Sequence, residues 1–216
     1  MNKITAVIPV RKGSQRIKNK NFKKFCGKSL LEHKIIQLKK VKNINKIIVN
    51  TDSIIAIRLA KKYKVDYYKR DKYFASSSCP NNKFWSNIAS TTNSKYILLT
   101  HCTSPMIKIS TYENCIKTFF QKKKIDSLNT VSEVREYLFL KKKPLNFNIK
   151  KAPNSQNLPT YLKYNSAVSI ISTSKMKKNK TVFGNKPFFY KLDLIESHDI
   201  NTTYDFELAK FLFKKY

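Results

Sequence analysis

The sequence has little glycine, histidine, tryptophan or acidic charge. Its 216 residues include three glycines, three histidines, four cysteines and one tryptophan, and 13 Asp+Glu stand against 44 Lys+Arg. The cysteines lack CxxC spacing, and with so few histidines this excludes the usual Cys/His zinc clusters. We therefore expect reduced thiols, a cytoplasmic location and a fold that does not depend on disulfides.

Long hydrophobic runs are also missing near the N-terminus. The segment MNKITAVIPVRKGS holds an apolar run of only about six residues before Arg11, too short for a signal sequence or a membrane span. We expect neither export nor membrane anchoring. The length predicts a single domain over residues 1–216.

The charge balance is strongly basic. The formal net charge is +31, yet lysine supplies almost all of the excess and is scattered along the chain. We interpret this as the composition of exposed positions, so we expect nucleic acid to bind only nonspecifically. Only five arginines occur, and two of them lie within residues 11–16. That clustering is informative because arginine is the preferred partner of phosphate and carboxylate.

Short apolar runs alternate with helical patterns in the first half. Buried strands are predicted at 4–10, 46–50 and 95–100, and helices at 29–42, 53–62 and 109–124. This alternation predicts an α/β fold with a Rossmann-like, doubly wound, mainly parallel sheet and ligands beyond the carboxyl ends of its strands. On the second helix, Ile54, Ile57 and Leu59 are expected to face the sheet.

The second half has a different pattern. Residues 127–144 and 163–172 look like strands, and a segment rich in proline and asparagine separates them. We expect a small inserted β element within about residues 128–175. A final helix is expected to be capped by Thr203 or Asp205 and to bury Phe206, Ala209, Phe211 and Leu212.

A basic loop follows the first predicted strand. In VIPVRKGSQRIKNKN, cationic side chains and backbone N–H groups can converge on phosphates, and Gly13 suggests a special backbone conformation or a close approach. Neither common nucleotide motif is present. Gly27-Lys28-Ser29 ends like a P-loop, but Phe22 stands where that motif requires glycine, and there is no GxGxxG.

The segment Ile8-Pro9-Val10-Arg11-Lys12-Gly13-Ser14, closed by Lys20-Asn21, resembles the N-terminal signature of the acylneuraminate cytidylyltransferases, or CMP-sialic acid synthetases. The 3-deoxy-manno-octulosonate cytidylyltransferases share a looser form of it. Further segments resemble the family's motifs in the same order: 25–30, 50–53, 68–75, 101–105, 165–168 and 199–202.

The resemblance implies transfer of CMP from CTP to the anomeric hydroxyl of a nonulosonic acid, with Mg²⁺ as cofactor. Catalytic roles would belong to Arg11, Lys20 and Asp199. Contacts with CTP would come from Arg11, Gly13, Ser14, Lys20, Asn21, Asp52, Arg70 and His101. Contacts with the sugar would come from Thr103, Ser104, Gln156 and Asn165.

Three positions depart from the family pattern. His101 replaces a glutamine and, titrating near neutrality, would give activity a pH dependence. Asn201 replaces an aspartate, which leaves Asp199 as the main metal ligand and predicts weaker Mg²⁺ binding. Ser155 replaces an arginine before Gln156, so a probable clamp for the sugar carboxylate is missing and the identity of the acidic sugar stays open.

Two other interpretations remain open. One is a related sugar nucleotidyltransferase that uses 3-deoxy-manno-octulosonate, another sugar or another nucleotide. The other is a catalytically weakened homologue or a basic protein that binds nucleic acid. The central β segment resembles the element through which family members dimerise, so a homodimer is expected.

Overall fold

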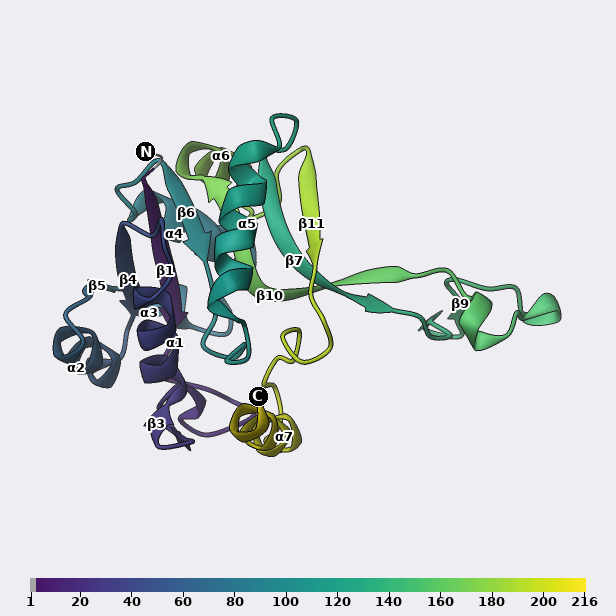
Figure 1. Ribbon diagram of the computed structural model, residues 1–216, viewed down its shortest axis with the longest axis horizontal. Helices are drawn as coiled ribbons and strands as arrows, with labels where there is room; N and C mark the ends of the chain where they lie inside the picture. Colours follow the sequence, from purple (N-terminus) through teal and green to yellow (C-terminus); the bar gives the residue numbers. More distant parts are fainter. Residues whose placement is uncertain (1–2) are drawn as a thin grey trace.

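A seven-stranded sheet organises residues 3–216, the part of the chain that the computed structural model describes (Figure 1). The strand order is β11-β7-β10-β6-β1-β4-β5, and only β10 runs antiparallel to its neighbours. The predicted mainly parallel, Rossmann-like sheet is therefore confirmed. The strands are β1 (Ile4–Val10), β4 (Lys46–Thr51), β5 (Asp66–Lys69), β6 (Tyr96–Leu99), β7 (Ser127–Val134), β10 (Tyr161–Ser172) and β11 (Pro187–Lys191).

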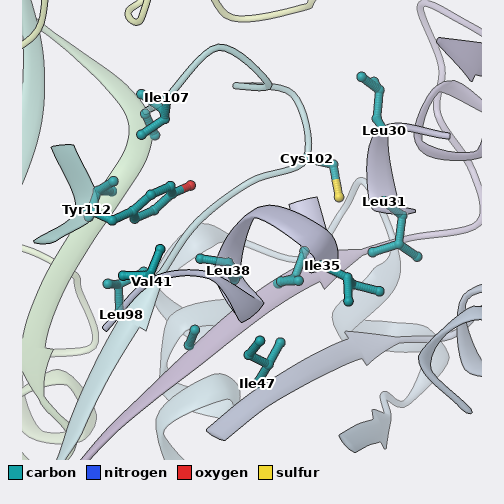
Figure 2. Close-up of a cluster of buried hydrophobic side chains, with 14 of the residues drawn as sticks. Leu30, Leu31, Ile35, Leu38, Val41, Ile47, Leu98, Cys102, Ile107 and Tyr112 are labelled. Carbon is teal, nitrogen blue, oxygen red and sulfur yellow. The ribbon is translucent and has the colours of Figure 1, made fainter. Parts of the chain in front are cut away.

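Helices cover both faces of the sheet. They are α1 (Leu30–Lys39), α2 (Ile54–Lys62), α3 (Lys72–Ala75), α4 (Asn81–Ser90), α5 (Ile109–Gln121), α6 (Thr173–Asn179) and α7 (Thr203–Lys215). Successive residues of β1 enter opposite cores because side chains alternate along a strand. Ala6 and Ile8 pack in the core that includes α1 and α5, and Val7 packs in the core that includes α4 and α6. Figure 2 shows part of the larger core.

Capping boxes start α1 and α7. The hydroxyl of Ser29 accepts a hydrogen bond from the N–H of Glu32, whose carboxylate accepts one from the N–H of Ser29 at 2.9 Å. Thr202 and Asp205 make the equivalent pair at α7. The prediction that Thr203 or Asp205 caps this helix is therefore wrong. Thr202 is the N-cap, and Asp205 is its partner in the capping box.

Two expected packing faces need correction. On α2, Leu59 packs against the core as expected, but Ala56 and Ala60 are the fully buried residues and Ile54 is 62% exposed. On α7, Phe206 and Ala209 are buried as expected, but Phe211 is 62% exposed. Helical spacing alone did not distinguish the large apolar residues that pack from those that do not.

An arm, residues 135–160, projects from the sheet (Figure 1). It contains the short hairpin β8 (Phe139–Leu140) and β9 (Lys143–Pro144) and the 3₁₀ turns η2 (Ile149–Lys151) and η3 (Ser155–Asn157). The strands that carry it, β7 and β10, belong to the central sheet. Of the expected 128–175 element, only the arm therefore lies outside the sheet.

Candidate active site

A cavity of about 470 Å³ lies beyond the carboxyl ends of β1 and β6. This is the edge of a parallel sheet where ligands are expected. Its walls come from the loops that follow β1, β5 and β6, so segments far apart in the sequence meet there. The polar and cationic lining residues include Arg11, Ser14, Arg16, Lys20, Asn21, Arg70, Ser76, Ser77, His101 and Thr103.

The loop after β1 is held by the loop after β4. The Asp52 carboxylate accepts a 2.9 Å hydrogen bond from the N–H of Lys12. Gly13 and Asp52 line a second hollow that shares Arg11 and Ser14 with the cavity. Within residues 3–216, a Cβ at Gly13 would meet no atom within 4 Å, and its φ does not lie in the left-handed region. The described part of the chain therefore does not itself require glycine at this position.

Arg70 forms part of the cavity wall from just after β5. Its Nη2 donates a 2.8 Å hydrogen bond to the carbonyl of Val10, and its guanidinium lies over the Phe84 ring at 5.2 Å. The Nε–H is buried, and none of the described residues accepts a hydrogen bond from it. Burial lowers the pKa of Arg70 to about 10, so the side chain stays cationic at neutral pH. Arg70 thus presents a fixed positive charge to the cavity.

Lys20 and Asp199 approach each other from opposite ends of the chain. Lys20 Nζ donates a 2.6 Å hydrogen bond to the carbonyl of Ile200. Burial lowers the pKa of Lys20. The negative charge of Asp199 acts to raise this pKa, and the positive charges of Arg16 and Arg11 act to lower it further. Asp199 does not line the cavity but lies beside two residues that do, Lys20 and His101.

The carboxylate of Asp199 has two different oxygens. Oδ2 accepts a 2.7 Å hydrogen bond from Asn201 Nδ2, whereas Oδ1 is buried and has no hydrogen-bond partner among residues 3–216. No group of three or more His, Cys, Asp or Glu suited to a metal occurs within residues 3–216. A free carboxylate oxygen fits Mg²⁺ when phosphates and water supply the other ligands. The Asn201 amide nitrogen is turned toward Asp199.

His101 differs from expectation. Burial lowers its pKa to about 4; nearby Asp199 acts against this shift, and Arg70, Lys20 and Lys34 act with it. The imidazole is therefore neutral through the range where a free histidine titrates. The prediction that His101 gives activity a pH dependence near neutrality is wrong, because sequence could not show how far the ring is buried.

Three of the predicted sugar contacts are not among the residues that line the cavity. The Ser104 side chain is buried, and the Asn165 carbonyl oxygen accepts a 2.7 Å hydrogen bond from Thr130 Oγ1. Gln156 is exposed on the arm. Of the four, only Thr103 lines the cavity. The serines at 76–77 were missed, although the run of small polar residues before Pro80 is a loop signal.

A basic cavity at the strand ends of a Rossmann-like sheet, beside a carboxylate, has the charge that a nucleoside triphosphate requires. Residues 5–215 match the family model described as "Cytidylyltransferase", and the chain belongs to this family. The family match and the cavity agree on an enzyme that transfers a nucleotidyl group.

Proteins from three sources are similar to the chain. It is 23% identical to "Post-translational flagellin modification protein B" of Campylobacter coli, over 100% of the chain and 97% of that protein. It is 26% identical to "N-acylneuraminate cytidylyltransferase" of Escherichia coli, over 96% of the chain and 51% of that protein. It is 22% identical to "CMP-N,N'-diacetyllegionaminic acid synthase" of Campylobacter jejuni, over 98% and 95%.

The fold is also similar to a solved structure, a CMP:2-keto-3-deoxy-manno-octonic acid synthetase complexed with CTP. The TM-score is 0.74 at 12% identity, covering 99% of each chain. At this identity the likeness concerns the fold alone.

Among the described residues, no helix combines the length and hydropathy needed to cross a membrane.

Proposed function

We propose that the chain transfers CMP from CTP to the anomeric hydroxyl of a nonulosonic acid of the sialic-acid type and releases pyrophosphate. The observation that carries this proposal is the convergence of Arg11, Lys20 and Arg70 on one cavity beside the free oxygen of Asp199. Fixed cations favour a triphosphate, and two similar proteins are named for sialic-acid-type sugars.

Charge stabilisation and positioning account for the reaction. A P–O bond forms between the sugar oxygen and the α-phosphorus, the bond to the β-phosphate breaks, and the hydroxyl proton passes to water. Arg11 and Arg70 offset the charge of the triphosphate and of the departing pyrophosphate, and Lys20 stabilises the developing charge. Mg²⁺ held through Asp199 would add positive charge at the α-phosphate. No side-chain nucleophile is required.

Of the two proposed substrates, the acidic sugar is less well defined than CTP. Ser155 offers no positive charge, and it lies on the arm next to Gln156. A 3-deoxy-manno-octulosonate acceptor is the second candidate, because the loop after β1 resembles that of both enzyme groups. A direct comparison of sugars decides between them.

We also propose that the enzyme is a cytoplasmic homodimer that pairs through the arm. Apolar side chains are unusually exposed there: Leu140 is 63% exposed, Ile149 is 62% exposed and Phe139 is 53% exposed. Burying them against a second copy would remove this surface from water. The four free cysteines agree with a reducing compartment.

Pyrophosphate release from CTP and Mg²⁺ tests the proposed reaction. The wild type is assayed with N-acetylneuraminate, legionaminate, pseudaminate and 3-deoxy-manno-octulosonate, and with UTP and GTP in place of CTP. Asp199→Ala should reduce a sugar-dependent signal by about a hundredfold or more. Glu207→Ala, which removes an exposed carboxylate from α7, is the matched control.

The outcomes separate the candidate functions. A signal with nonulosonic acids and CTP supports the proposal, and a signal with 3-deoxy-manno-octulosonate alone supports the second candidate. CTP binding without turnover of any sugar would indicate a weakened homologue. Nucleic-acid affinity that survives physiological salt, with no CTP preference, would overturn the enzyme interpretation in favour of a nucleic-acid-binding protein.

A further inference from the structure

Lys34 is a lysine buried in the core beneath the cavity. It lies on the buried face of α1 and is only 1% exposed, although lysine side chains are almost never fully buried. Its Nζ donates hydrogen bonds to Gln37 Oε1 at 2.6 Å, to the Ser104 carbonyl at 2.8 Å and to the Tyr112 hydroxyl at 2.7 Å. All three donors of the ammonium group are therefore used.

These hydrogen bonds hold the first half of the loop after β6, residues 100–104. Thr100 begins that loop, and Ser104 lies at its middle. The Tyr112 hydroxyl bridges Lys34 and Thr100, with 2.8 Å between the hydroxyl oxygens of Tyr112 and Thr100. Between these two anchored residues lie His101 and Thr103, which line the cavity. One ammonium thus fixes the segment that presents them.

The charge of Lys34 is not balanced by a carboxylate. Within residues 3–216 no carboxylate lies at ion-pair distance from it. Figure 2 shows two of its ionisable neighbours, Cys102 and Tyr112, among apolar side chains. Burial raises the pKa of Cys102 to about 12 and raises that of Tyr112 still further, so both stay neutral. His101, which also faces Lys34, is neutral as well.

A buried cation is costly, and it persists here because its hydrogen bonds are complete. Burial lowers the pKa of Lys34 to about 7. A neutral amine has two N–H donors and one lone pair, so it could donate to only two of its three partners. Tyr112 could donate to that lone pair while Thr100 donates to Tyr112, but the hydrogen bonds to Gln37 and to the Ser104 carbonyl would then be neutral ones, which are weaker, and the loop would be held less firmly.

We propose that Lys34 is a positioning residue of the nucleotide site, whose protonated ammonium fixes residues 100–104 and thereby His101 and Thr103. Lys34 also adds an uncompensated positive charge behind a cavity that suits a polyanion. The inference rests on the proposed CTP site and deepens it, because it makes nucleotide affinity depend on a residue that does not touch the nucleotide.

The test is the pH dependence of CTP affinity, measured by calorimetry from about pH 6 to about pH 9. Above about pH 7.5 the titrations of free phosphate groups and of ordinary histidines are largely complete, so they do not contribute to changes in affinity there. Wild type is compared with Lys34→Met, Lys34→Arg and Lys39→Met, an exposed change on the same helix. Thermal melting of each variant establishes that it is folded.

We expect CTP affinity of the wild type and of Lys39→Met to fall roughly tenfold toward alkaline pH, the size of one charged hydrogen bond. Lys34→Met should bind roughly tenfold more weakly at acidic pH and show little of this fall. Lys34→Arg should regain affinity and hold it to higher pH, because arginine does not lose its proton.

Three results would overturn the inference. A folded Lys34→Met variant that matches Lys39→Met in affinity and pH profile shows that the residue is only structural. If Lys34→Met does not fold, the wild type is decisive: an affinity for CTP that stays constant to pH 9 also shows that Lys34 is only structural. A wild type that binds no CTP at any pH instead refutes the nucleotide site, and this inference falls with it.

Discussion

Lys20 and Ile200 are 180 positions apart in the sequence, yet the ammonium of Lys20 donates a 2.6 Å hydrogen bond to the carbonyl of Ile200. This contact joins the loop after β1 to the segment that carries Asp199. The carbonyl of Thr103 extends the connection, since it accepts a hydrogen bond from the N–H of Ile200 at 2.9 Å. Three loops are thereby held around one cavity.

Replacing Lys20 should damage catalysis more than folding. Lys20→Met removes a cation from the cavity and the hydrogen bond to Ile200, so we expect kcat to fall by about a hundredfold. Pyrophosphate release measures this effect, and Lys24→Met, an exposed change in β2 (Lys24–Phe25), is the control. Equal rates for the two variants would remove Lys20 from the mechanism.

His101 should make the fold sensitive to acid. Its folded-state pKa of about 4 lies below the ordinary value of 6.5. The unfolded chain therefore takes up this proton first as the pH falls, and stability present above pH 6.5 is lost toward pH 4. His101→Gln should lose less stability between these values. Urea unfolding at both ends of the range measures it, and equal losses would contradict the assigned protonation state.

Asn201→Asp should lower the stability of the fold and raise its affinity for Mg²⁺. The variant replaces the 2.7 Å hydrogen bond between Asn201 and Asp199 with two adjacent carboxylates. In EDTA we expect a loss of about 1–2 kcal/mol in the free energy of unfolding. With Mg²⁺, half-maximal activity should require less metal. Melting with and without Mg²⁺ tests the first effect; an unchanged Mg²⁺ titration would rule out Asn201 as a determinant of metal affinity.

The arm should control the oligomeric state. Leu140→Asp places a charge on the most exposed apolar position of the hairpin and should shift a dimer to monomers. Light scattering compares it with Lys142→Ala, a change in the same turn that leaves the apolar surface intact. A wild-type monomer, or a Leu140→Asp dimer of undiminished affinity, would show that pairing through the arm is wrong.

Sequence patterns predicted five strands of the central sheet, β1, β4, β6, β7 and β10, because buried strands have apolar runs. They missed the edge strands β5 and β11, which have no buried run. Arg11 and Lys20 could be predicted as cavity residues since they directly follow the first strand. Lys34 could not: its partners Ser104 and Tyr112 lie 70 and 78 residues away, and although its helical spacing matches that of the buried Leu31 and Ile35, a lysine side chain is almost never fully buried. The sequence also did not reveal that α2 packs through its alanines, because small residues contribute little to hydrophobic periodicity.

The contact between Lys20 and Ile200 also orders events during biosynthesis. Ribosomes release the loop after β1 early, but residue 200 emerges only after the central sheet has been made. A nascent chain that already has most of its strands therefore still lacks the contact that links the loop after β1 to the segment of Asp199. Lys20 and Asp199 can come together only once synthesis has passed this point.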